Sequence, residues 1–154
     1  FKGITKFADE EPIILIAIGA LILIKNRRIG SSIAVNLASS AFVNHLIKEI
    51  VQRPRPPIEF RMVEESSFSF PSGHAMTSTA FYGLIIYFVF KNVKNKKIRN
   101  TICTVLSLLI FLIGISRIYL GVHYASDVLA GFAFGIVYLV LYITFVLELF
   151  KIKE

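Results

Sequence analysis

Charged residues and cysteine are both scarce in this chain. Only 18% of its 154 residues are charged, whereas about a quarter are charged in an ordinary soluble domain. The 55% hydrophobic content and the mean hydropathy of +0.70 exclude a disordered tail, a nucleic-acid arm and an ordinary soluble enzyme. This composition predicts a single membrane-embedded domain over residues 1–154.

The single cysteine, Cys103, excludes an internal disulfide and a cysteine-based metal site. Because it lies in an apolar run, it is interpreted as a small packing residue. The sequence has no internal repeat, no low-complexity tract and no strand-like alternation long enough for a membrane barrel. The predicted fold class is therefore all-α.

Five apolar stretches predict that the chain forms a polytopic membrane helix bundle. The five stretches are Pro12–Ile24, Ser31–Ile47, Ala75–Phe90, Ile102–Ile115 and Val128–Leu147. The last has 20 residues without a charge, enough to cross a hydrocarbon core of about 30 Å. The second is interrupted by serine, asparagine and histidine, so its polar face is expected to point toward other helices rather than lipid.

Basic residues alternate with these stretches in a way that predicts the orientation. Ten of the 17 basic residues fall between the first and second stretch, between the third and fourth, or after the fifth. These ten are Lys25, Arg27, Arg28, Lys91, Lys94, Lys96, Lys97, Arg99, Lys151 and Lys153. The positive-inside rule makes their side cytoplasmic. The remaining segments, 1–11, 51–71 and 119–124, are then extracytoplasmic.

Three cations fall at the extracytoplasmic helix ends. Lys48, Arg55 and Arg117 would lie at the edge of a low-dielectric slab, where an unpaired charge is costly. Neighbouring acids could pair with some of them, and a bound phosphate could pair with all three. We therefore favour a phosphate site over three separate snorkelling side chains. The acids in question are Glu49, Glu59, Glu64 and Glu65.

The run Pro71-Ser72-Gly73-His74 opens the third apolar stretch. A helix N-terminus offers free N–H groups to an anion, and glycine lets the backbone approach closely. Ser72 is also a good N-cap, and the two roles are compatible. His74 would lie in the first turn and face the same anion.

His123 and Asp127 are four residues apart and would share one face if the segment is helical. The carboxylate could then accept the Nδ1 proton and leave Nε2 as a nucleophile. His74 could supply a proton to the leaving group, and no cluster has metal-ligand spacing. The pattern predicts hydrolysis of a phosphomonoester through a phosphohistidine, without a metal or other cofactor.

These residues resemble the three-part signature of the type-2 phosphatidic acid phosphatase superfamily. All eleven of its fixed positions match in order and spacing. They are Lys48, Arg55, Pro56, Pro71, Ser72, Gly73, His74, Ser116, Arg117, His123 and Asp127. The resemblance implies an α-helical bundle, usually of six spans, that dephosphorylates lipid phosphates without metal. Five spans are visible, so it also implies a further span before Phe1.

The resemblance also implies a role for each site residue. His123 would be the nucleophile, Asp127 its orienting partner and His74 the general acid. The phosphate would be bound by Lys48, Arg55, Ser72, Gly73 and Arg117.

The compact size resembles bacterial phosphatidylglycerophosphate phosphatases, which places the chain in a bacterial plasma membrane. The expected partners are membrane lipids and a lipid phosphate substrate, not nucleic acid. Phosphatidylglycerophosphate is the first expected substrate, and undecaprenyl diphosphate and phosphatidate are alternatives. The oligomeric state is left open.

Two other functions stay open at this point. Vanadate-dependent haloperoxidases have nearly the same signature, but they are soluble, which argues against them here. A non-catalytic anion binder or transporter is a more remote alternative, because such proteins often have inverted repeats and broken helices, and the sequence has neither. Outside the signature, His45 is interpreted as a helix-packing or hydrogen-bonding residue, and Arg53 as a peripheral phosphate or headgroup contact. Tyr119 and Tyr124 are interpreted as interfacial residues, with lining of the substrate site as the alternative.

Overall fold

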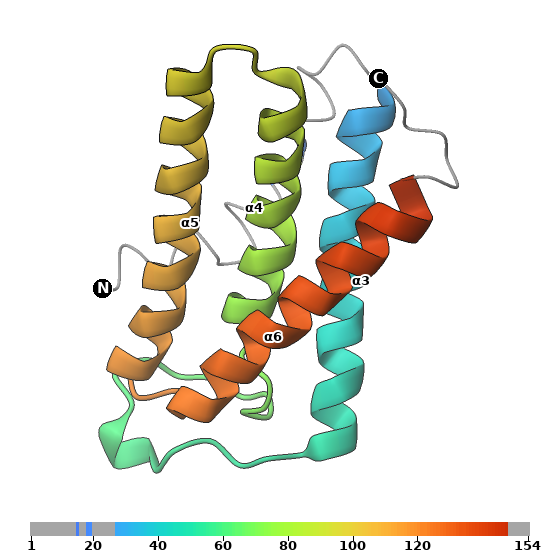
Figure 1. Ribbon diagram of the computed structural model, residues 1–154. Coiled ribbons are helices and arrows are strands. Elements are labelled where there is room, and N and C mark those ends of the chain that lie inside the picture. Colours follow the sequence, from blue (N-terminus) through green and yellow to red (C-terminus); the bar gives the residue numbers. More distant parts are fainter. Residues whose placement is uncertain (1–14, 16–17, 20–26, 148–154) are drawn as a thin grey trace.

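The computed structural model describes residues 15, 18, 19 and 27–147 (Figure 1). Every regular element in this part of the chain is helical, so the all-α prediction is confirmed there. The elements are α3 (Arg27–Val51), the short 3₁₀ helix η2 (Ile58–Phe60), α4 (Gly73–Asn92), α5 (Lys96–Tyr119), α6 (Ala125–Leu141) and the π-helical turn η3 (Tyr142–Leu147).

Three of the predicted spans are long and apolar enough to cross a membrane. They are α4, α5 and the continuous helix Ala125–Leu147 formed by α6 and η3. The second predicted span is α3, which has 25 residues, or about 37 Å of helix, but is more polar. The first predicted span, Pro12–Ile24, lies outside the described residues except for positions 15, 18 and 19.

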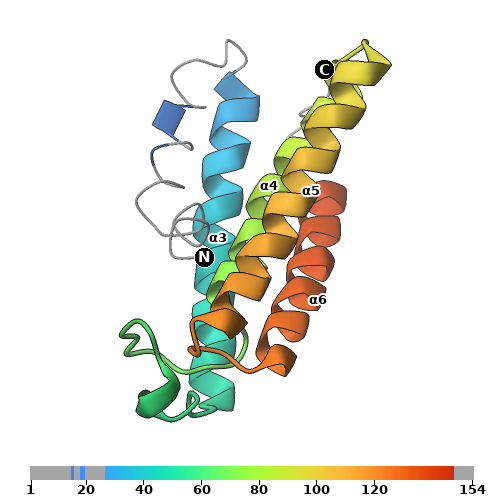
Figure 2. The ribbon, with the colours of Figure 1, turned by 90° about the vertical axis from the view of Figure 1, so that its left-hand side faces the viewer.

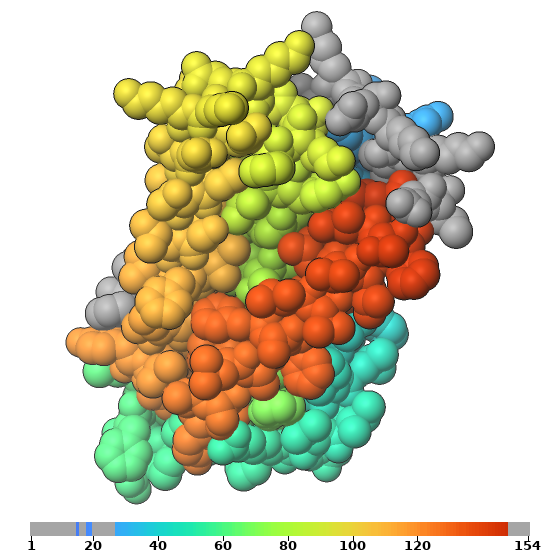
Figure 3. Space-filling model, viewed as in Figure 1, coloured from blue at the N-terminus to red at the C-terminus, as the bar shows by residue number. Residues whose placement is uncertain are grey.

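α4 is the central helix of the bundle and packs against α3, α5 and α6 (Figures 1 and 2). α6 crosses obliquely over the face of α4, and Figure 3 shows it lying across the front of the molecule. The buried apolar core lies between these helices, and its largest fully buried side chains include Phe81, Leu84 and Ile113.

The polar face of α3 points into the bundle, as predicted. A row at four-residue spacing is buried, consisting of Ser32, Asn36, Ser40, Asn44 and Lys48. The opposite face carries exposed apolar side chains such as Phe42 and Leu46. The His45 side chain is exposed and does not pack inside the described part of the bundle, and a hydrogen-bonding role for it stays a prediction.

Two glycines on α6 allow the close crossing with α4. A Cβ added at Gly131 would lie 2.8 Å from Ser72 O, and one at Gly135 would lie 2.7 Å from Thr79 Cβ. Small residues four apart are the usual means by which membrane helices approach closely. The crossing brings the first turns of α4 and α6 together, and the Ser72 N–H donates to Asp127 O at 3.0 Å.

The helix directions place the chemically distinctive loops at one end. α3 and α5 end there, and α4 and α6 begin there, so residues 52–72 and 120–124 meet (Figures 1 and 2). Gly121 has φ +70°, and a Cβ at this position would collide with Phe60 O. The α5–α6 turn and the long loop are thereby packed against each other. The basic α4–α5 turn and the start of α3 lie at the opposite end.

Candidate active site

All eight predicted site residues lie at the end of the bundle where the two loops meet. Lys48 and Arg117 are in the last turns of α3 and α5, and His74 is in the first turn of α4. Arg55, Ser72 and His123 come from the connecting segments, and Asp127 is in the first turn of α6. Four stretches that are distant in sequence therefore form one site.

His123 is buried, and its two ring nitrogens face different groups. Arg55 NH1 lies 3.2 Å from Nε2 and also donates to Val122 O at 3.0 Å. On the other side, Nδ1 lies 3.7 Å from Asp127 Oδ2 and 3.5 Å from the Ser69 hydroxyl. A guanidinium is thus next to the nitrogen that the sequence assigns to nucleophilic attack.

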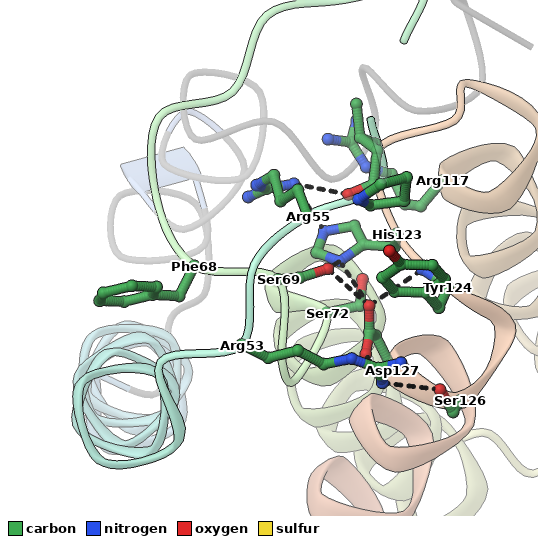
Figure 4. A network of polar contacts seen from close by, with 12 residues as sticks. Arg53, Arg55, Phe68, Ser69, Ser72, Arg117, His123, Tyr124, Ser126 and Asp127 are labelled. Atoms are coloured by element: carbon green, nitrogen blue, oxygen red, sulfur yellow. Dashed lines mark hydrogen bonds and ion pairs between the residues drawn. The ribbon is translucent and has the colours of Figure 1, made fainter. Parts of the chain in front are cut away.

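Asp127 is fully buried and is surrounded by donors (Figure 4). Its Oδ2 accepts from the Ser69 hydroxyl at 2.6 Å and from Tyr124 N–H at 2.9 Å. Its Oδ1 accepts from Arg53 NH1 at 2.7 Å. These bonds leave the carboxylate ionic and held in place, which suits a group that orients a neighbouring imidazole.

The reason for the His123–Asp127 contact differs from the prediction. His123 precedes the N-cap residue Tyr124, so the pair does not share a helical face. Asp127 instead turns back over the start of α6 to cap Tyr124 N–H, which brings its carboxylate to the preceding imidazole. The spacing of four is correct, but a capped turn produces the contact.

The loop before α4 is held by two of the predicted phosphate-binding cations. Lys48 Nζ donates to Phe68 O and lies 3.4 Å from the Ser67 hydroxyl. Arg55 Nε donates to Ser67 O at 2.6 Å, and Arg55 NH2 donates to the Ser67 hydroxyl at 3.0 Å. Ser69 N–H completes the attachment by donating to Arg53 O at 2.8 Å.

Glu65 lies between two buried guanidiniums. Its Oε1 forms an ion pair with Arg117 NH2, and its Oε2 lies 3.4 Å from Arg55 NH2. The arginine side chains are only 3–4% exposed, whereas that of Glu65 is 27% exposed. Of the four acids that the sequence offered as partners, Glu65 is the one that pairs with both buried arginines.

The start of α4 has the cap that the sequence predicts. The Ser72 hydroxyl accepts from Ala75 N–H at 3.4 Å. A Cβ at Gly73 would lie 3.1 Å from Asn44 Oδ1, so glycine permits the close approach of α4 to α3 beside Lys48. His74 is half-buried and is close enough to Glu65 to stabilise its ionised form.

Burial decides the protonation of His123. The pKa of the His123 imidazole is lowered to about 4, mainly because the ring is removed from water. The interaction with Asp127 raises this pKa, whereas the positive charges of Arg55, Lys48 and Arg117 lower it further. Burial alone would raise the pKa of Glu65, but Arg117, Arg55 and His74 outweigh it and the pKa is lowered. At neutral pH the site therefore holds an uncharged imidazole and an ionised glutamate.

Three residues of this site have roles that the sequence analysis did not assign. Arg53, interpreted as a peripheral phosphate or headgroup contact, bonds Asp127 and Ser126, and its guanidinium lies 4.4 Å from the centre of the Tyr124 ring. Glu65 was one of four acids offered as partners for the cations, but its bridge between two arginines was not predicted. Ser69 received no role, and it lies between two phenylalanines just before Pro71. Within residues 27–147, no three His, Cys, Asp or Glu side chains are grouped as a metal site would require.

Comparison with known proteins agrees with this arrangement. The PAP2 superfamily profile matches residues 30–151. The chain belongs to the PAP2 superfamily. The resemblance inferred from the eleven motif positions is thus confirmed at the level of the family.

Named relatives of this PAP2 chain act on lipid phosphates. It is 37% identical to phosphatidylglycerophosphatase B of Bacillus subtilis over 129 residues, covering 81% of this chain and 62% of that protein. It is 36% identical to decaprenylphosphoryl-5-phosphoribose phosphatase of Mycobacterium tuberculosis over 143 residues, covering 87% and 72% respectively. The chain therefore spans less than two thirds of the Bacillus relative's length.

The fold also matches a solved membrane structure. A crystal structure of a transmembrane PAP2-type phosphatidylglycerolphosphate phosphatase from Bacillus subtilis superposes with a TM-score of 0.83 at 34% identity, covering 99% of this chain and 76% of that one. With the three apolar helices, this identifies the PAP2 chain as an integral membrane protein.

Proposed function

We propose that this protein is a lipid phosphate phosphatase that hydrolyses a phosphomonoester on the extracytoplasmic side of a bacterial plasma membrane. The observation that carries the proposal is the uncharged, buried imidazole of His123, with Arg55 NH1 3.2 Å from its Nε2. A neutral nitrogen beside a buried cation is suited to attack a phosphorus atom whose oxygens the cation holds.

In the first step, His123 Nε2 forms a bond to phosphorus as the bond from phosphorus to the lipid oxygen breaks. His74 donates a proton to that oxygen, so the lipid leaves as an alcohol. Arg55, Arg117 and Lys48 balance the charge on the phosphoryl oxygens, and the first N–H groups of α4 add to this at Ser72 and Gly73.

In the second step, water attacks the phosphorus of the phosphohistidine, and the bond to Nε2 breaks. His74, now neutral, accepts a proton from the water. Inorganic phosphate leaves, and both histidines return to their starting state. Asp127 keeps the imidazole oriented through both steps, held by Arg53 and Ser69. Because the side chains supply the positive charge, activity is expected to persist in EDTA.

Phosphatidylglycerophosphate is the proposed substrate, since the relatives in Bacillus subtilis are named for it. The mycobacterial relative is named for a decaprenylphosphoryl substrate. A polyprenyl phosphate such as undecaprenyl diphosphate is therefore the second proposed substrate. Phosphatidate is the third. The motifs contact the phosphate and not the lipid tail, so a release assay across these three lipids decides among them.

The membrane topology is part of the proposal. α3, α4, α5 and the α6–η3 helix would be four spans, and the apolar stretch Pro12–Ile24 would be a fifth. The buried polar row of α3 explains how a helix with this polarity could cross the bilayer, because its apolar face is the exposed one.

The test is phosphate release by the purified protein in phosphatidylglycerophosphate vesicles. The wild type should release phosphate and form an acid-labile phosphoprotein, because a phosphoramidate bond to histidine hydrolyses in acid. His123→Ala should lose both signals by at least about 10³-fold.

The matched control is His45→Ala, which removes an exposed histidine from the same chain and should keep full activity. Undiminished turnover by His123→Ala would reject the nucleophile. Binding of phosphate without hydrolysis of any of the three lipids by the wild type would favour an anion-binding protein instead.

A further inference from the structure

The loop between α3 and α4 carries an apolar tip outside the membrane-spanning helices. Ile58 and Phe60 belong to η2, and Met62 follows it. Their exposed fractions are 73%, 68% and 52%. Loops at the end of a bundle are normally polar where they meet water, so a cluster of large exposed apolar side chains indicates a contact surface.

This tip is held in a fixed position by backbone contacts. Phe60 N–H donates to Pro57 O at 3.1 Å, and Met62 N–H donates to Leu120 O at 3.0 Å. Arg61 Nε donates to Pro56 O at 2.7 Å. Gly121 packs directly beneath Phe60 O. The apolar side chains are therefore presented outward by an attached turn.

The tip is attached at the end of α5. That helix is a candidate span, and its exposed side chains include Leu108, Phe111 and Ile118. The bond from Met62 N–H to Leu120 O holds the apolar tip next to the end of this apolar helix.

The end of α3 also carries exposed apolar side chains, at the same level of the molecule as η2. Ile50 is 81% exposed, and Val51 beside it is also exposed. Figures 1 and 2 both show η2 level with this end of α3. Exposed apolar side chains on two separate elements thus reach the same height on the molecule.

From this geometry we propose that Ile58, Phe60 and Met62 form an interfacial anchor that inserts into the bilayer leaflet on the active-site side. The partner is the acyl-chain and headgroup boundary of that leaflet, and insertion of about 5–10 Å is expected. Exposed Glu59 and Glu64 would remain among the headgroups and water. The anchor would hold the loop carrying Arg55 and Glu65 against the membrane surface.

The sequence contains no tryptophan, so single-tryptophan variants can report the depth of this turn. Phe60→Trp in the full chain is reconstituted into vesicles with or without lipids brominated at known acyl positions. We expect blue-shifted emission and a loss of about half of the intensity with bromines near the carbonyl end of the chain, as for an interfacial side chain.

Two matched variants calibrate the measurement. Glu64→Trp, exposed on the same loop, should emit at longer wavelength and be quenched little. Leu108→Trp, on the exposed face of α5, should be quenched most by bromines deep in the chains. Phe60→Trp emission that matches Glu64→Trp would overturn the proposal. So would emission that is blue-shifted only at high protein density, because that result identifies a second copy as the partner.

A functional arm rests on the proposed phosphatase activity and fails separately from the fluorescence. Ile58→Ser with Phe60→Ser should lower kcat/KM several-fold for a long-chain lipid phosphate in vesicles. The same variant should leave hydrolysis of a water-soluble short-chain analogue unchanged, which shows that the fold is intact. Equal losses on both substrates would contradict an anchoring role.

Discussion

At the scale of single residues, the most informative contact is the one between Glu65 and the two arginines. A carboxylate and a phosphate compete for the same guanidinium donors, and Glu65 lies where Arg55 and Arg117 can both reach it. Its side chain is the least buried of the three, so it can leave while the arginines stay. Glu65 is therefore expected to act as an internal competitor for anions.

Replacing Glu65 by Gln should strengthen anion binding. Removing its charge frees the guanidiniums, so the inhibition constant for vanadate or inorganic phosphate should fall about tenfold, equivalent to ~1.4 kcal/mol. The measurement is a titration of phosphate release with each anion. The neighbouring exposed Glu64→Gln should behave as wild type. Weaker or unchanged inhibition of Glu65→Gln would show that Glu65 supports the site instead of competing with its ligand.

The protonation of His123 gives a second prediction at this scale. Because burial lowers its pKa to about 4, the imidazole should stay neutral down to that pH in the folded protein. The unfolded chain takes up the proton near the ordinary pKa of about 6.5. Burial of neutral His123 therefore costs no stability above about pH 6.5, where the ring is neutral in both states. As the pH falls from there toward 4, the unfolded chain binds a proton that the folded protein does not, so the free energy of unfolding decreases.

Histidine NMR in detergent micelles can check this directly. The protein has three histidines, and His45→Ala and His74→Ala variants assign the signals. The His123 ring should titrate well below pH 6. A His123 titration near 6.5 would mean that the ring is open to water, and the neutral nucleophile would then not be prepared by burial.

At the scale of elements, the crossing of α4 and α6 positions two of the proposed catalytic residues, His74 and Asp127. Gly131 and Gly135 let the helices approach, and the Ser72 N–H bond to Asp127 O joins their first turns. His74 and Asp127 are therefore placed by helix packing as well as by the loops. The partners of these glycines on α4 become visible only in the folded bundle.

Gly135→Ala should destabilise the bundle. Its new Cβ would lie 2.7 Å from Thr79 Cβ and 2.8 Å from Met76 O, and the latter is backbone that cannot easily move. Overpacking of this kind costs about 1–3 kcal/mol, which should lower Tm by several degrees. Thermal unfolding in detergent measures the change. Val137→Ala, on the exposed face of α6, is the control and should have little effect.

At the scale of the whole molecule, the basic turns lie at the end of the bundle opposite the candidate site. Arg27 and Arg28 and the basic α4–α5 turn lie at one end, and the site lies at the other. Because consecutive helices run in opposite directions, the α4–α5 turn must lie at the end opposite the α3–α4 and α5–α6 connections. The positive-inside rule then predicts that the site faces away from the cytoplasm.

Cysteine labelling in intact cells tests the orientation. In a Cys103→Ser background the chain has no thiol, so Glu64→Cys and Lys94→Cys each give a single reporter at one end. A membrane-impermeant maleimide should label Glu64→Cys in intact cells and Lys94→Cys only after permeabilisation. The reverse pattern would place the site on the cytoplasmic side.

The sequence by itself determined the helical class and the inward polar face of α3, and it predicted one site formed by eight residues that the fold places at the same end of the bundle. These follow from hydropathy, from helical periodicity and from motif spacing, which are local properties of the chain. Lys48, Arg55 and Arg117 could be grouped because each falls at the same predicted membrane surface.

Only the tertiary structure decided the partners inside that site. Arg53 and Ser69 reach Asp127, and Glu65 reaches two arginines, through loop paths that no periodicity encodes. The contact of His123 with Asp127 likewise comes from a capped turn and not from a shared helical face. Hydrogen-bond partners of irregular loops depend on where distant helix ends meet, and that meeting is fixed by packing across the whole bundle.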